Sequence, residues 1–174
     1  MSNLRLINET TATNVASISA TDIFSTDFDI YKVILSVDDG TQPDNIYGRF
    51  INSSGSVVTN SSYDWANADL NSYGAFTQQR YVNQTFFYNL LQAEAGTNQG
   101  GNAVIYVFNP YSSSSYSYIL GQTSQYFNSS NYARSRKYIG ILKQTSSITG
   151  LNFYTSASGT PDFSIKTYGL RVDS

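Results

Sequence analysis

The sequence predicts a single antiparallel β-sandwich over residues 1–174, jelly-roll-like and with very little helix. Apolar and polar side chains alternate along most of the chain, which is the period of a half-buried strand. About ten such stretches follow one another at short intervals, and turn residues separate them. Aromatic residues, which fit a pleated sheet well, make up 15% of the chain. Among sandwiches, we expect a jelly roll of eight main strands.

The N-terminal segment leaves two alternatives open. Leu4–Asn8 is a short apolar strand that polar residues separate from the next strand. Residues 1–14 either form an edge strand of the same sheet or an arm that adds to the sheet of a neighbouring copy. In the second case Leu4, Leu6 and Ile7 are the candidate assembly contacts.

The clearest strand covers residues 28–37, where the side chains alternate strictly. The face that we expect in the core carries Tyr31, Val33, Leu35 and Val37. Lys32 lies on the opposite face, because a shift of one residue would expose the whole apolar set. The face with Lys32 is mixed in character.

The remaining expected elements are short strands between turns. They are Ala16–Phe24, Ile46–Asn52, Val57–Asn60, Thr85–Leu91, Ala103–Asn109, Tyr116–Thr123, Lys137–Gln144, Leu151–Ser156 and Phe163–Val172. The residues 52–55 predict a hairpin turn with Gly55 in a left-handed conformation. The best helical candidate, Ala66–Leu70, is long enough for one turn only.

The composition excludes much chemistry. The chain has no histidine and no cysteine, so Ser–His–Asp triads, thiol nucleophiles and zinc–thiolate sites are excluded. Aspartates are plentiful, but nothing in the sequence selects a pair of carboxylates for glycoside hydrolysis. We therefore expect no enzymatic activity and no cofactor.

An acidic loop is the one candidate for a cation site. Asp38, Asp39 and Asp44 could supply oxygen ligands to Ca²⁺. The spacing does not match an EF-hand loop, so a solvated hairpin tip is the preferred interpretation, and we expect that no metal is needed.

Two segments suggest binding. Tyr63 and Trp65 lie in an expected surface loop, where they could stack on a sugar ring or form a core or interface anchor. The segment Tyr126–Tyr138 mixes aromatic residues with three basic ones, a pattern that can bind single-stranded nucleic acid. So few basic groups on an acidic chain argue against it, and we expect no nucleic-acid partner.

The chain carries no sign of targeting. No apolar stretch near the N-terminus resembles a signal peptide. No stretch approaches the 18 or so apolar residues that a membrane-spanning helix needs. We expect a protein made in a bacterial cytoplasm and no membrane partner.

Four segments together suggest a family. Asp27–Val33, Gly101–Pro110, Tyr138–Thr149 and Ile165–Leu170 resemble strands of small virion structural proteins of tailed bacteriophages, especially those of marine phages and cyanophages. The resemblance extends over nearly the whole chain in order. It implies a β-sandwich that occurs in many copies on the particle and assembles by packing and β-pairing. It implies no catalytic residues.

Composition and resemblance favour the same function. Only 13% of the residues are charged, and tyrosine-rich surfaces with few lysines and glutamates suit repeated contacts. We expect a virion protein, a capsid decoration or tail-associated component, that contacts copies of itself as a trimer or larger array and other virion proteins. The alternative is a receptor- or glycan-binding module at a fibre or tail tip, with a host-surface glycan as ligand.

Overall fold

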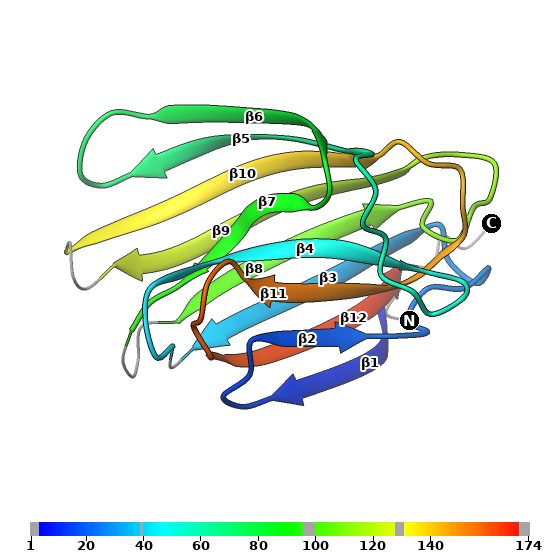
Figure 1. Cartoon of the computed structure of the whole chain (residues 1–174), viewed down its shortest axis with the longest axis horizontal. Coiled ribbons are helices and arrows are strands. Elements are labelled where there is room, and N and C mark those ends of the chain that lie inside the picture. Colours follow the sequence, from blue (N-terminus) through cyan, green and yellow to red (C-terminus); the bar gives the residue numbers. More distant parts are fainter. Residues whose placement is uncertain (1–3, 39, 96–99, 128–130, 171–174) are drawn as a thin grey trace.

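Two antiparallel sheets pack face to face (Figure 1). The computed structural model describes residues 4–38, 40–95, 100–127 and 131–170. The strands are β1 (Leu4–Ala12), β2 (Ser17–Ala20), β3 (Ile30–Asp38), β4 (Asp44–Asn52), β5 (Tyr63–Asn71), β6 (Thr77–Gln84), β7 (Phe87–Ala93), β8 (Gly101–Phe108), β9 (Ser117–Phe127), β10 (Tyr132–Leu142), β11 (Ile148–Thr155) and β12 (Asp162–Leu170). The described residues contain no helix, and hence none that could cross a membrane. The predicted all-β sandwich is confirmed.

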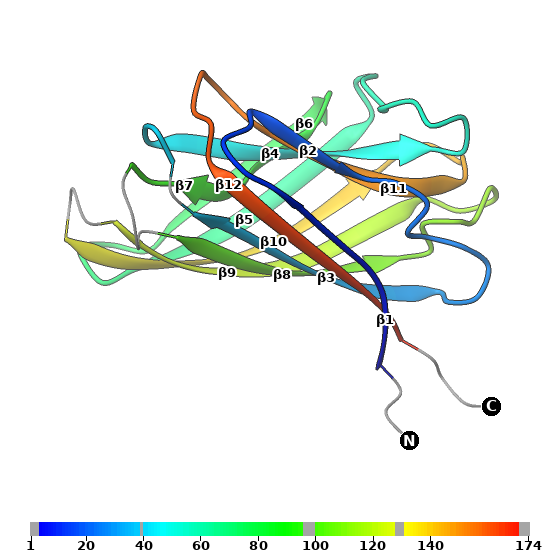
Figure 2. The same cartoon turned by 90° about the horizontal axis from the view of Figure 1, so that it is seen from below.

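The strand pairing is that of a jelly roll with two inserted hairpins. β1 pairs with β12, β2 with β11, β3 with β8 and β4 with β7, so that the first strands pair with the last. The hairpins β5–β6 and β9–β10 both join the larger sheet. Its eight strands follow the order β1-β12-β3-β8-β9-β10-β5-β6, against β2-β11-β4-β7 in the four-stranded sheet. Figure 2 shows the two sheets as separate layers.

The core lies between the sheets and follows the predicted register. In β3 the side chains of Tyr31, Val33, Leu35 and Val37 are at most 1% exposed. Lys32 lies on the outer face, as expected. From the small sheet, Phe50 and Phe87 pack edge to face against one another inside the sandwich.

Two local predictions are wrong, and one strand was missed. The helical turn expected at Ala66–Leu70 is part of β5, whose residues alternate between buried and outward positions. The hairpin strand β6 was not expected at all, and Val57–Asn60 forms only an isolated bridge from Val57 to Ile51. The turn before it is confirmed, since Gly55 has a φ of 79° and donates to the Asn52 carbonyl.

The N-terminal segment is an edge strand of the chain's own sheet. Leu4 pairs with Leu170 and Leu6 with Tyr168, and a bulge at Ile7 precedes the rest of the β1–β12 ladder. In the single chain Leu4–Ala12 therefore forms an edge strand, and the addition of this segment to a neighbouring copy stays a prediction. Residues 1–3 lie outside the described part.

Candidate functional site

Tyr63 and Trp65 lie in the core rather than in a surface loop. They point inward from β5 and are 0% and 3% exposed. The Tyr63 hydroxyl donates to the Val58 carbonyl and accepts from the Phe50 amide, and its ring packs edge to face on Phe87. Their role as a surface sugar platform is therefore wrong, because neither ring reaches solvent. The core-anchor alternative describes them.

The described residues of the acidic loop do not assemble a cation site. Asp44 is 4% exposed, and its carboxylate accepts hydrogen bonds from the Ser156 hydroxyl and from the backbone amides of Ala157 and Gly159. Asp38 is exposed at the end of β3, and Asp39 lies outside the described residues. Within the described ranges no group of three or more acidic side chains is placed to hold a metal ion. Asp44 therefore fixes the turn that leads into β12.

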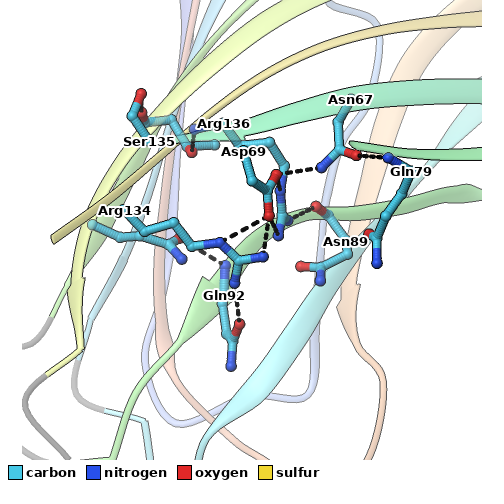
Figure 3. A network of polar contacts seen from close by, with 10 residues as sticks. Asn67, Asp69, Gln79, Asn89, Gln92, Arg134, Ser135 and Arg136 are labelled. Atoms are coloured by element: carbon cyan, nitrogen blue, oxygen red, sulfur yellow. Dashed lines mark hydrogen bonds and ion pairs between the residues drawn. The ribbon is translucent and has the colours of Figure 1, made fainter. Parts of the chain in front are cut away.

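A buried polar network joins the inserted hairpins to β7 (Figure 3). Asp69 of β5 lies opposite Arg136 of β10 in the ladder. The Arg136 Nε donates to Asp69 Oδ1 at 2.7 Å and its Nη2 to Oδ2 at 3.1 Å. The Nε of Arg134 donates to Oδ2 at 3.0 Å, and Asn67 Nδ2 donates to Oδ1 at 2.5 Å. Every oxygen of this carboxylate is thus occupied.

The network extends across to the small sheet through a backbone irregularity. Arg136 Nη1 donates to the carbonyl of Asn89, a residue of β7 with a φ of 48°. Asparagine adopts this left-handed conformation more readily than most residues. Arg134 Nη1 reaches Gln92 of the same strand at 3.3 Å. Two arginines therefore tie β10 to both β5 and β7.

The electrostatics of the network indicate a structural role. Burial alone would raise the pKa of Asp69, but the hydrogen bonds from Arg136 and Arg134 outweigh burial and hold this pKa below its ordinary value. An ionised carboxylate with both oxygens occupied is a poor proton donor or base. The arginines of the segment 126–138 also point inward, with Arg136 1% exposed. Two of the three basic residues of this segment, Arg134 and Arg136, thus form ion pairs inside the protein, whereas Lys137 is exposed.

An aromatic cluster covers part of the outer face of the small sheet. We define it as Tyr47, Arg49, Phe86, Tyr88 and Tyr154, which are all half-buried. Tyr47 stacks on Phe86 with ring centroids 4.5 Å apart, and the Arg49 guanidinium lies 4.5 Å from the Tyr154 ring centroid. Burial raises the pKa of Tyr154 to about 12. Its hydroxyl has no hydrogen-bond partner among the described residues.

The outer face of the large sheet carries two rows of apolar side chains. The ladder aligns one row as Leu6, Tyr168, Lys32, Tyr106, Leu120, Ile139, Ala66 and Arg80. The next row is Leu4, Leu170, Ile30, Phe108, Tyr118, Ile141 and Asp64. We call these rows the apolar band. All its members except Lys32, Arg80 and Asp64 are apolar or tyrosine.

The apolar band is open to solvent and hollowed. Ile139 is 59% exposed, although an isoleucine in the middle of a sheet is normally covered. A groove of about 530 Å³ lies over Ile139 and Tyr118 and extends to Val82 of β6. A second groove of about 610 Å³ continues it over Tyr106 and Lys32.

The same face becomes polar at the other ends of the strands. There the ladder aligns Ser164, Ser36, Asn102 and Ser124. The apolar band is therefore limited to one end of this face. A low content of charged residues in the whole chain would not by itself produce such a boundary. The largest apolar patch on a soluble protein is often a functional one. The band is the candidate functional site.

Comparisons with known proteins identify no family. No family model matches the chain, and no curated protein matches it. Among solved structures, the alginate lyase Aly36B in complex with an alginate trisaccharide aligns at 8% identity, with 97% of this chain, 88% of that chain and a TM-score of 0.30. A PL-14 alginate lyase from Aplysia kurodai aligns at 9% identity over 86% and 72%, with a TM-score of 0.33.

A virus structure, of the infectious bursal disease virus Gx strain, aligns at 5% identity. It covers 96% of this chain and 39% of that chain, with a TM-score of 0.19. TM-scores this low indicate neither a shared detailed fold nor a shared activity. The jelly-roll assignment therefore stands on the strand pairing itself.

Proposed function

We propose that this protein is a non-enzymatic structural component of a tailed-phage virion, present in many copies as a capsid decoration or accessory protein or as a tail-associated protein. The observation that carries the proposal is the solvent-exposed apolar band, in a chain with only 13% charged residues. Contact surfaces between proteins are depleted in lysine and glutamate and enriched in aromatic residues. The virion setting rests on the resemblance of the strands to phage structural proteins.

The chemistry of the buried polar groups supports a non-catalytic role. Asp69, the most deeply ion-paired carboxylate of the network, has both oxygens occupied by arginine and asparagine donors. The sequence has no histidine or cysteine to supply a base or nucleophile. Asp69 and its partners therefore support the fold, and we assign the function to the surface of the protein.

The test is to locate the protein on purified phage particles. Mass spectrometry of the particles should find its peptides at a copy number comparable to that of other repeated shell or tail proteins. Labelling with an antibody should then place it on one part of the particle. Purified particles that lack the protein, from cells in which it is expressed, would contradict the proposal.

The aromatic cluster supports a second candidate, a receptor- or glycan-binding module. Aromatic faces stack on the C–H faces of sugar rings, and Arg49 can donate to hydroxyl or carboxylate oxygens. A glycan array should show binding that Tyr47→Ala abolishes and that Tyr118→Ala, on the other sheet, leaves intact. An array without any signal removes this candidate.

A further inference from the structure

We infer that the partner that covers the apolar band is a second copy of this chain, packed face to face about a two-fold axis. This inference rests on the proposed assembly role and names its contact. The axis lies parallel to the strands, between β8 and β9, the central pair of the large sheet. The pair is a dimeric unit, rather than the trimer expected from composition, because two sheets pack face to face as a pair with their strands nearly aligned.

The size of the band fits such a pair. Strands lie about 4.8 Å apart and alternate side chains about 6.8 Å apart, so two rows across eight strands project roughly 500 Å². Side-chain relief and the adjoining Ile34 and Val104 bring the buried area toward the about 800 Å² per partner of standard interfaces.

The order of the strands makes the face complementary to itself. Rotation about this axis places each strand over its counterpart from the other half of the sheet, so β8 faces β9 and β3 faces β10 of the second copy. Tyr106 of one copy then lies over Leu120 of the other, and Ile30 of one copy lies over Ile141 of the other. The centre of the contact, on β8 and β9, consists of Tyr106, Phe108, Tyr118 and Leu120.

The same two-fold axis determines which side chains lie over the charged residues of the band. Lys32 faces Ile139 of the other copy, with Asp64 and Lys137 of that copy at neighbouring positions of the ladder. Arg80, on the edge strand β6, faces Leu6 of β1 in the other copy, and Asp64 faces Leu170 of β12. Each charged side chain of the band thus lies over an apolar one, whereas an axis across the strands and through the row of Lys32 would place Lys32 over Lys32.

Single cysteines test this arrangement, because the chain has none of its own. Leu120→Cys places a thiol beside the axis, and two such thiols lie within reach of a short bismaleimide in the dimer. Ser19→Cys, at an exposed position of β2 on the outer face of the other sheet, is the matched control. We expect a cross-linked dimer from Leu120→Cys and none from Ser19→Cys.

A second position keeps the test decisive if Leu120→Cys does not fold. Tyr106→Cys lies on the other side of the same axis and should give the same dimer. Equal cross-linking of the band and control positions, or none at the band, overturns the inference. The two proposals fail separately. A monomer that is found on particles removes the face-to-face pair and keeps the virion role, while a cross-linked dimer absent from particles does the reverse.

Discussion

Asp69 carries the main buried electrostatic interaction of the molecule. It is 2% exposed and neutralises one of two arginines that lie beside it, of which Arg136 is 1% exposed. We expect Asp69→Asn to lower the free energy of unfolding by about 3–5 kcal/mol, because the substitution leaves the guanidinium groups buried without a counter-charge. The melting temperature should fall by roughly 10 °C. Urea unfolding of this variant measures the effect, with Asp27→Asn at an exposed position as the control. Equal stability of the two variants would show that the network is not a significant source of stability.

The same residue sets a pH dependence. The pKa of Asp69 is lowered in the folded protein, so the stability from its ionised form is fully present above about pH 4, the ordinary aspartate range. It is lost as the pH falls through the lower pKa of the folded state. Between about pH 7 and about pH 3, the urea midpoint of the wild-type protein should fall further than that of Asp69→Asn. Parallel curves for the two proteins would assign the acid sensitivity to other groups.

Gly121 makes room for a buried ring. It lies opposite Tyr138 in the β9–β10 ladder, and a Cβ atom at this position would overlap the Tyr138 ring. Tyr138 is 1% exposed and cannot move away. We therefore expect Gly121→Ala to cost about 1–3 kcal/mol of stability. Ser124→Ala, an exposed position of the same strand, should be close to neutral, and a neutral Gly121→Ala would mean that the ring relocates.

At this scale the sequence predicts the clear alternation and misses the polar interior. The inward positions of Tyr31 and Val33 follow from period two. The sequence suggests only a possible nucleic-acid contact for the segment that contains Arg136, because nothing in one sequence reveals that Asp69, far away in the chain, lies opposite it. The core positions of Tyr63 and Trp65 follow only once β5 is known to be a strand, because the alternation of that strand turns both side chains inward.

β1 is an edge strand whose loss should affect the molecule itself. Ile7 and Ala12 pack against the core, and the ladder satisfies the outer edge of β12. Deletion of residues 1–12 should lower the melting temperature of the isolated protein by several degrees. An unchanged melting temperature together with a changed oligomer mass would instead support the N-terminal arm.

The hairpin β5–β6 shows why local patterns fail at the level of elements. Ala66, Ala68 and Leu70 are good helix formers, yet they lie on the outer face of β5. The inward residues of the same strand, among them Trp65 and Asp69, have partners on β10 and β7. Tertiary packing thus overrides helix propensity here. β6 escaped prediction because it is exposed on both faces along most of its length and has no alternation to detect.

The distribution of apolar residues is the property of the whole molecule that points to assembly. β8 reads Ala-Val-Ile-Tyr-Val-Phe over residues 103–108, a continuous run of the kind found in strands that are covered on both faces. One face of β8 meets the core, and the other carries Val104, Tyr106 and Phe108 in or beside the apolar band. Such runs were visible in the sequence, whereas their alignment into rows required the register.

The mass of the protein in solution tests the central claim, that the apolar band is the contact between copies. Ile139→Asp places a charge at the centre of the band on a side chain that is 59% exposed, so the fold should persist. Ser19→Asp places the same charge on the outer face of the small sheet. In sedimentation equilibrium over the micromolar range, we predict dimers for the wild-type protein and Ser19→Asp and a monomer for Ile139→Asp. A wild-type monomer throughout, or a dimer that Ile139→Asp leaves intact, would contradict the account.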